Sequence, residues 1–277
     1  EIMPSLVGSE MCIRDRSISM CLLAFSIHNH PNYPFILVSN RDEAYDRSAV
    51  PLHTWLNYPE VTGGLDLKEK GTWLGYTKQG KFATLLNHPF TDWQPDLDPP
   101  RSRGHLLKDY LTHDFGPGEF ERVLKASRRR YNSYHLLYGS FDDLHYYSNA
   151  GDKSFRYQPG LYSLANTQDD LSRHRLDKSA CLLKNYLASH ERDVKLKDLT
   201  QLMTDQEQAK TLPNLPPSLS PETAKDRSSI FIKGEEFGTV ATTALLVDQA
   251  GIISVREVRY DQTGVTEVTE KVQRLTR

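Results

Sequence analysis

Long apolar runs and paired cysteines are both scarce in this chain of 277 residues. No window approaches the ~18 uninterrupted apolar residues that a membrane-spanning helix needs, so the sequence predicts no integral membrane segment. Its three cysteines, Cys12, Cys21 and Cys181, show neither a short pairing motif nor the spacing of zinc ligands. Such usage is typical of a reducing compartment, and we expect no disulfide.

An excess of one charge is also missing, because 34 Lys and Arg residues are balanced by 36 Asp and Glu residues. A net charge of -2 provides no overall field that would attract nucleic acid, so we expect no nucleic-acid partner. The histidines do not form the H-x-x-x-H or H-E-x-x-H patterns of zinc sites, and we expect no metal site. This applies to His53, His88, His105, His113 and His174.

The order of patterns predicts an α+β fold in which helices cover antiparallel sheets. Short apolar runs joined by turns occupy residues 21–87, and Gln79-Gly80 is typical of a tight hairpin. Helical periodicity follows in residues 101–130, and again in 171–210 after two further strands. The Pro-rich residues 212–222 are expected to be a surface loop. Three closing strands are expected at 228–233, 239–248 and 252–260, with the last strands returning to pair with the first.

Residues 1–19 do not match this organisation. Cys12 precedes a run of alternating charge, "IRDR", which cannot form a buried strand, whereas Cys21 precedes the apolar run "LLAFSIH". We therefore expect residues 1–19 to be a non-native or disordered extension, Met20 to be the initiator, and residues 20–277 to form one domain.

A cysteine that follows an initiator methionine can become the first residue of the mature chain. Cys21 would then carry a thiol, with a pKa near about 8.5, beside an α-amine, with a pKa near about 7.7–8.0, so the amine can accept the thiol proton. The next apolar run ends at Asn40-Arg41-Asp42-Glu43. Because a turn separates the two runs, we expect this tetrad to lie beside Cys21 at adjacent strand ends.

Several blocks of this sequence resemble the NRDE family, which includes the transport and Golgi organisation proteins. The resemblance covers residues 20–277 and rests on Met20-Cys21 followed by "SNRDEAYDR", "GGLDLKEKGTWLGYTKQGKFATLLN", "RSRGHLLKDYL", "YYSN", "LYSLANT" and "FGTVATTALLVD". That family is similar to N-terminal-nucleophile hydrolases of the penicillin V acylase and bile-salt hydrolase type. The resemblance thus implies a four-layer αββα sandwich.

The resemblance also implies roles for individual residues. Cys21 would be both nucleophile and base, Asp42 would orient it, and Asn87 and Asn166 would donate hydrogen bonds to the oxyanion. The substrate-binding residues would be Arg41, Glu43 and Trp73. The chain departs from the family pattern at Val240, which replaces an arginine, and it lacks the Trp and Lys that usually follow the "LSN" turn.

Each of these residues also has a structural interpretation that the sequence leaves open. A cysteine in an apolar strand is ordinarily a small buried hydrophobe, residues 40–43 can form an ion-pair knot, and asparagines are common in turns. Trp73 can simply fill the core. Residues 101–104, "RSRG", are either an anion-binding helix start or a solvated cap.

Two functions of different classes follow from the resemblance. The first is hydrolysis of a small amide, thioester or lipid-like acyl substrate. The second is a non-catalytic carrier or trafficking protein, in Golgi organisation and secretion, whose cleft holds an apolar ligand such as haem or a lipid. Both predict a small apolar or acyl ligand, no resident cofactor and a cytoplasmic protein that associates with Golgi or mitochondria. The oligomeric state stays open.

Overall fold

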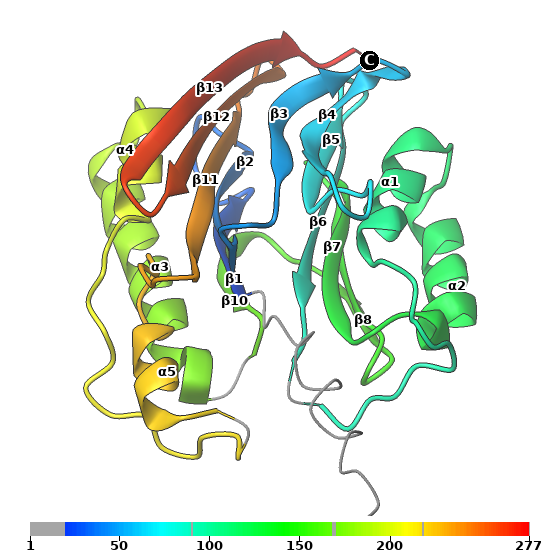
Figure 1. The fold of residues 1–277 in the computed structure, drawn as a ribbon. Helices are drawn as coiled ribbons and strands as arrows, with labels where there is room; N and C mark the ends of the chain where they lie inside the picture. Colours follow the sequence, from blue (N-terminus) through cyan, green and yellow to red (C-terminus); the bar gives the residue numbers. More distant parts are fainter. Residues whose placement is uncertain (1–19, 90, 168–169, 218, 277) are drawn as a thin grey trace, which may run out of the picture.

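The computed structural model describes residues 20–89, 91–167, 170–217 and 219–276, so the expected extension at residues 1–19 lies outside the described residues. Two antiparallel sheets face each other, and helices cover the outer face of each (Figure 1). This arrangement confirms the predicted α+β fold with four αββα layers. No helix in the described residues combines the length and hydropathy that crossing a membrane requires.

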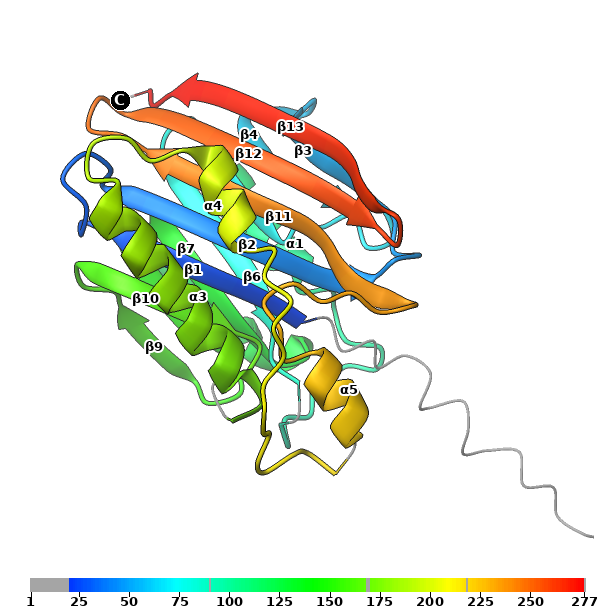
Figure 2. The same ribbon diagram turned by 90° about the vertical axis from the view of Figure 1, so that its left-hand side faces the viewer.

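Strands from the two ends of the chain, with one strand from its middle, form the first sheet, seen face-on in Figure 2. Its order is β10 (Gly160–Ala165), β1 (Met20–Ile27), β2 (Phe35–Ala44), β11 (Phe237–Val247), β12 (Ile252–Asp261) and β13 (Gly264–Arg274). The pairing of β2 with β11 confirms that the closing strands return to the first ones.

Consecutive strands form the second sheet. Its order is β3 (Ala49–Trp55), β4 (Tyr58–Asp66), β5 (Leu74–Thr77), β6 (Lys81–Asn87), β7 (Tyr134–Ser140), β8 (Leu144–Ser148) and β9 (Lys153–Arg156). Gly80 has φ +90° in the β5–β6 turn, a conformation that glycine adopts without a steric cost, which confirms the hairpin expected at Gln79-Gly80.

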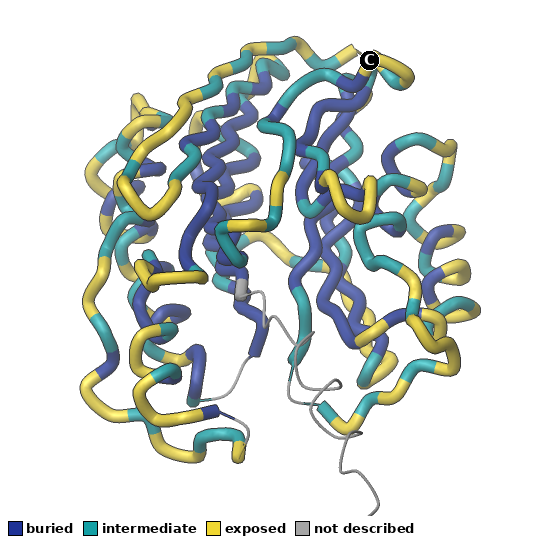
Figure 3. Tube along the Cα trace, viewed as in Figure 1, coloured by how far each residue is buried: buried dark blue, intermediate teal, exposed yellow. Residues whose placement is uncertain are grey.

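Alternating side chains of β1 and β2 divide the core into layers, because successive residues of a strand point to opposite faces. Leu23 and Phe25 of β1 pack between the sheets with Phe35 and Leu37 of β2. The intervening side chains, such as Ala24, pack outward against the helical layer. Figure 3 shows that the central strands are buried along most of their length. Cys21 in β1 and residues 40–43 in β2 are therefore buried within the sandwich.

The helices bury their apolar faces on the outer faces of the sheets. Helices α3 (Asp170–Ser189) and α4 (Leu196–Leu202) cover the first sheet, whereas α1 (Gly104–Thr112) and α2 (Pro117–Ser127) cover the second. Leu106, Leu107, Tyr110 and Leu111 of α1 are all buried, as their helical spacing predicts.

Three expectations about the C-terminal third were wrong. Residues 228–233 form no strand beyond an isolated bridge between Lys233 and Gly238. Strand β13 was missed, because its mostly exposed side chains give it little apolar patterning. The Pro-rich segment is not entirely loop, because it leads into the short helix α5 (Pro221–Asp226), whose first turn is capped by the Ser220 side chain.

Candidate active site

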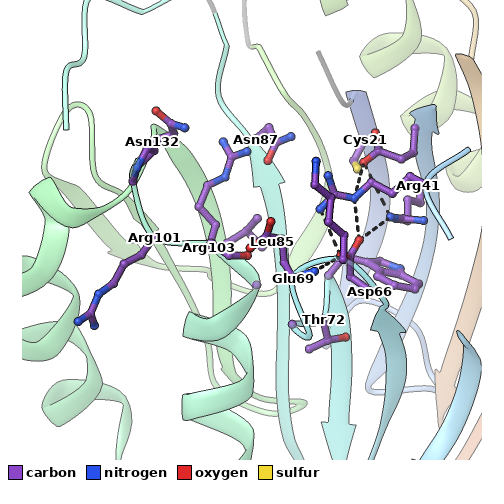
Figure 4. Close-up of a pocket in the computed structure, with 18 of the residues that line it drawn as sticks. Cys21, Arg41, Asp66, Glu69, Thr72, Leu85, Asn87, Arg101, Arg103 and Asn132 are labelled. Carbon is purple, nitrogen blue, oxygen red and sulfur yellow. Dashed lines mark hydrogen bonds and ion pairs between the residues drawn. The ribbon is translucent and has the colours of Figure 1, made fainter. Parts of the chain in front are cut away.

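Cys21 lies near the start of β1, at one end of the space between the sheets. Its cross-strand partner in β2 is Arg41, and its main-chain nitrogen donates a hydrogen bond to the Oδ1 atom of Asn166. Cys21 is 8% exposed and lines a cavity of about 510 Å³ (Figure 4). The predicted juxtaposition of the two strand ends is therefore present, and the thiol borders the cavity.

The surroundings of Cys21 disfavour the thiolate. Burial is the main cause that raises the pKa of its thiol to about 11, and the negative charge of Asp42 raises it further. A backbone hydrogen bond from Asp42 and the positive charge of Arg41 oppose this shift without cancelling it. At neutral pH the thiol is thus protonated, and a nearby base is needed to make it nucleophilic.

The tetrad of residues 40–43 is divided between the two faces of β2. Because side chains alternate along a strand, Arg41 and Glu43 line the cavity, while Asn40 and Asp42 contact the outer layer. Two residues of the motif can therefore contact a ligand, and the other two attach the strand to the outer helical layer.

The two outward side chains are completely buried and hydrogen-bonded. Asn40 donates to the carbonyls of Met203 and Ile230, at 2.9 Å each, and accepts from the hydroxyl of Thr242 at 2.7 Å. These bonds join β2 to β11 and to the segments after α4 and α5. The amide of Asn40 therefore has a structural explanation that requires no ligand.

The Asp42 carboxylate is paired with Arg175 of α3. Its Oδ2 atom lies 2.7 Å from Nη2 of Arg175, and its Oδ1 accepts a hydrogen bond from Thr239 at 2.6 Å. Both ionic side chains are 0% exposed. Burial raises the pKa of Asp42, whereas Arg175 and Thr239 oppose that rise. Asp42 thus influences Cys21 through its charge and its backbone, and its predicted orienting role stays a prediction.

On the cavity side, Arg41 belongs to a group of charged side chains. Its Nη2 atom lies 3.4 Å from Asp66 and 3.8 Å from Glu43. Its guanidinium stacks on Trp73, with Cζ 4.3 Å from the ring centroid. Arg47 makes the shorter contacts with Asp66, at 2.8 and 3.2 Å. The ion-pair interpretation of the tetrad therefore holds for Arg41 and Glu43, and the three predicted substrate-binding residues lie together at the cavity.

The two predicted oxyanion residues occupy different positions relative to Cys21. Asn87 ends β6 in the second sheet and lines the cavity across from Cys21 (Figure 4). Asn166 directly follows β10, the neighbour of β1, and it is 0% exposed. Its Oδ1 accepts a hydrogen bond from the main-chain nitrogen of Cys21. Asn87 is thus placed to face a ligand, and Asn166 is placed to hold the main chain of Cys21.

A buried histidine supports the Asn166 turn. His135 Nε2 lies 3.1 Å from the carbonyl oxygen of Asn166, and its Nδ1 lies 2.6 Å from the hydroxyl of Tyr146. Burial, and secondarily the charge of His88, lower the pKa of His135 to about 3, so the ring is neutral. Since a carbonyl can only accept, Nε2 carries the proton and Nδ1 accepts from Tyr146. This fixed tautomer holds the turn in place.

The start of α1 borders the cavity from the side of the second sheet. Gly71 and Gly104 approach so closely that a Cβ on Gly71 would lie 2.7 Å from the main-chain carbon of Gly104. This contact brings Arg103, the residue before α1, to the cavity. Its Nη1 donates to the carbonyl of Ser133 at 3.0 Å.

Sequence reasoning missed three residues that shape this site. Arg175 carried a signal, since it lies four residues after Leu171 on the apolar face of its helix, where a charge requires a buried partner. Arg103 was noticed only as part of "RSRG". Asp66 carried no signal, because it ends β4 and meets Arg41 and Arg47 only through the pairing of β4 with β3 and the packing of the two sheets, and not through any spacing in the sequence.

The cavity does not fit haem as a coordinated group. Haem iron is held by His, Cys, Met or Tyr, and among the described lining residues Cys21 is the only one of these types. Its raised pKa disfavours the thiolate that would bind iron. Across the described ranges of the chain, no group of three or more His, Cys, Asp or Glu side chains is arranged to hold a metal ion.

Sequence relatives cover most of the chain. The family model described as "Transport and Golgi organisation 2" matches residues 20–262. The human Transport and Golgi organization protein 2 homolog is 29% identical over 264 residues, which cover 86% of this chain and 92% of that protein. The mouse homolog is 27% identical over 266 residues, with the same coverage.

Solved structures with little sequence identity share the fold. A mutant of the conjugated bile acid hydrolase from Clostridium perfringens superposes with a TM-score of 0.52 and 11% identity, covering 90% of this chain and 96% of that one. Penicillin V acylase from Agrobacterium tumefaciens gives a TM-score of 0.51 and 12% identity, covering 85% of this chain and 82% of that one. The chain therefore belongs to the Transport and Golgi organisation 2 family and has the αββα fold of the N-terminal-nucleophile hydrolases.

Proposed function

We propose that this protein is a cysteine-nucleophile hydrolase of amides or thioesters, active once Cys21 carries a free α-amine. The observation that carries the proposal is the position of Cys21, whose thiol borders a cavity while its main-chain nitrogen is held by Asn166. The same residue thus presents the sulfur and the nitrogen that an N-terminal nucleophile needs, and Asn87 faces it from the other sheet.

The reaction follows from these positions. The neutral α-amine of Cys21 takes the thiol proton, and the sulfur forms a bond to the carbonyl carbon of the substrate. The carbonyl π electrons move to its oxygen, and the side-chain amide of Asn87 stabilises this oxyanion. Collapse of the intermediate breaks the bond to the leaving amine or thiol, which takes the proton back from the ammonium. Water then attacks the acyl-cysteine with the amine as base. The carbon–sulfur bond breaks to release the acid, and the ammonium returns its proton to the sulfur, which restores the thiol.

Because the pKa of the thiol is raised, the α-amine is needed to form the thiolate at neutral pH. With a pKa of about 11, only about one thiol in ten thousand is ionised at pH 7. An adjacent ammonium would favour the thiolate through its positive charge, as other cationic neighbours do for cysteine. We therefore expect a chain that begins at Cys21 to be far more reactive than one that retains the preceding residue.

The test compares these two chains, one beginning at Cys21 and one at Met20, both with Cys181→Ser so that Cys21 is the single thiol. Each is incubated with an acyl-directed electrophilic probe between pH 6 and pH 10, and the adduct at Cys21 is measured by mass spectrometry. We expect adduct formation near neutral pH only for the chain beginning at Cys21. In the longer chain the rate should rise about tenfold for each pH unit, because it follows the thiolate fraction.

The same experiment uses Asn87→Ala to test the oxyanion donor and Arg122→Gln as the matched control. Asn87→Ala in the chain beginning at Cys21 should lower the acylation rate by about 10²-fold, the usual effect of losing one oxyanion donor. Arg122→Gln, at an exposed position of α2, should leave it unchanged. No adduct in the chain beginning at Cys21, with an intact fold by circular dichroism, would contradict the proposed hydrolase.

A non-catalytic ligand carrier is the second candidate function. The protonated thiol favours it, as does Val240, which stands where the family usually has an arginine and does not line the cavity. Under this function, lipid that co-purifies with the protein would be retained in Cys21→Ala. Under the hydrolase function, an acyl product would disappear with the same change. A cytoplasmic location and association with Golgi or mitochondria stay predictions, which fractionation of cells would check.

A further inference from the structure

The cavity beside Cys21 is lined mainly by polar and charged groups. Its lining includes five basic side chains, Arg41, Arg47, Lys68, Arg101 and Arg103, and four acidic ones, Glu43, Asp66, Glu69 and Asp98. The few larger apolar groups are Trp73, Leu85, Pro99 and Pro100. Arg41, Arg47, Glu43 and Asp66 compensate one another in part. A purely apolar ligand would still desolvate the other charges of the lining without giving them a partner, which is costly. The lining therefore favours a ligand that carries charge.

Arg41 is a buried cation with spare hydrogen-bonding capacity. Only 6% of the residue is exposed, and its Nη1 atom has no partner among the described residues. Its nearest carboxylate, Asp66, accepts shorter hydrogen bonds from Nε and Nη2 of Arg47 and also accepts one from the backbone nitrogen of Glu69. The charge of Arg41 is thus only partly compensated, at a position that borders the cavity.

Arg103 is a second cation without a carboxylate of its own. It is half-buried, donates one hydrogen bond to the carbonyl of Ser133, and makes no ion pair with any carboxylate in the described residues. Desolvation lowers its pKa to about 10, although the nearby charges of Glu43 and Cys21 act in the opposite direction. The side chain therefore stays cationic at neutral pH. Figure 4 shows its guanidinium beside Asn87, whereas Arg101 points away from Cys21.

We infer that this cavity binds its ligand through an anionic oxygen group, a carboxylate or a phosphate, held between Arg103 and Arg41. Guanidinium groups bind both anions with paired N–H donors. Arg41 reaches the cavity from β2 of the first sheet, and Arg103 reaches it from the start of α1, on the side of the second sheet. The inference deepens the proposed function, on which it rests for the reaction: the substrate is an acyl compound with an anionic group, bound so that its carbonyl lies between Cys21 and Asn87.

Binding can be measured without chemistry, in a Cys21→Ala chain that retains both arginines. Isothermal titration calorimetry measures the affinity for hexanoate, hexyl phosphate and hexanol. The first two show whether a carboxylate or a phosphate is preferred, and hexanol shows the contribution of the shared alkyl chain. We expect at least one of the two anions to bind at least tenfold more tightly than hexanol. The preferred anion should also quench tryptophan fluorescence, because Arg41 stacks on Trp73.

Substitutions at Arg103 test whether this arginine holds the anion. Arg103→Gln should weaken binding of the preferred anion at least tenfold and leave hexanol unaffected, and Arg103→Lys should restore part of the loss. The matched control Arg122→Gln should change neither. Equal affinity for hexanol and both anions in the Cys21→Ala chain would overturn the inference, even if the Arg103 variants failed to fold. Because this chain has no nucleophile, that result is distinct from failure of Cys21 to react with an acyl probe.

Discussion

At the scale of single residues, the position of a charge along β2 decides its role. Arg41 and Asp42 are neighbours in sequence, yet Arg41 borders the cavity while Asp42 is buried against α3. The pair of Asp42 and Arg175 is fully buried directly behind the strand that carries the cavity residues. A buried pair of this kind contributes little net stability but is costly to break, because the remaining charge is left without compensation.

Arg175→Met should therefore lower the free energy of unfolding by about 3–5 kcal/mol at pH 7. The double variant Asp42→Asn with Arg175→Met should recover much of this loss. Since burial raises the pKa of Asp42 in the folded protein above its ordinary value of 3.8, the folded state binds the proton more tightly. The deficit of the single variant should shrink as the pH falls toward 3.8.

These differences in unfolding free energy are measured by urea unfolding at pH 4 and pH 7 of the parent, the single variant and the double variant. Arg122→Met, at an exposed position, provides the control. Equal losses in the single and double variants would show that the pair does not act as a unit, and a deficit independent of pH would show that the Asp42 charge is not its cause.

At the scale of elements, β2 is the strand to which the other parts of the site are attached. It pairs with β1, which carries Cys21, and with β11, which carries Thr239. A register shift between Thr239 and Ala241 leaves Val240 as an extra residue in β11. Such a bulge bends its strand locally, here next to Asp42, which pairs with Thr239.

Asn40→Ala tests the attachment of β2 to the outer layer. The change leaves the carbonyls of Met203 and Ile230 without their donor and the hydroxyl of Thr242 without its acceptor. We expect a loss of about 2–4 kcal/mol in unfolding free energy, because each unsatisfied buried group costs about 1–3 kcal/mol. Chemical denaturation measures it, and Asn57→Ala in the exposed β3–β4 turn should cost less than about 0.5 kcal/mol.

If Asn40→Ala lost anion binding and kept its stability, this structural role of Asn40 would be contradicted. The side chain would then contact the ligand, although its hydrogen bonds all lie on the outer side of β2.

At the scale of the whole molecule, the last strand joins the two sheets along one edge (Figure 1). Leu275 packs against the core between the sheets. Lys271 Nζ donates to the hydroxyl of Thr54 at 3.2 Å, and the Thr276 backbone nitrogen donates to the carbonyl of Lys78 at 2.9 Å. The matched family region ends at residue 262, before β13 begins.

Truncation after Gln262 should lower the stability and expose a new sheet edge at β12. We expect a loss of at least about 2 kcal/mol, or roughly 5 °C in melting temperature, together with self-association through the unpaired edge. Calorimetry and sedimentation at two protein concentrations measure both effects. An unchanged melting temperature and a monodisperse truncated chain would show that β13 contributes little to the closure of the sandwich.

The sequence by itself determined the layers of this protein. Period-two alternation in β1 and period-3.6 spacing in α1 are local properties, and they decide which side chains are buried wherever the element packs. The order of the motif blocks likewise predicted the family. The two apolar runs and the turn between them predicted that Cys21 and residues 40–43 lie at adjacent strand ends. Strand β13 escaped prediction because exposed edge strands have little apolar patterning.

Only the tertiary structure decided the partners within the site. Arg175 and Asp42 are 133 residues apart, and Cys21 and Asn166 are 145 apart, so no local pattern could pair them. The same holds for Arg103, which reaches the cavity because two glycines allow α1 to approach the β4–β5 loop. The pKa of Cys21 depends on burial and on charges from other strands. These properties arise from distances between elements, which are set by packing and not by spacing along the chain.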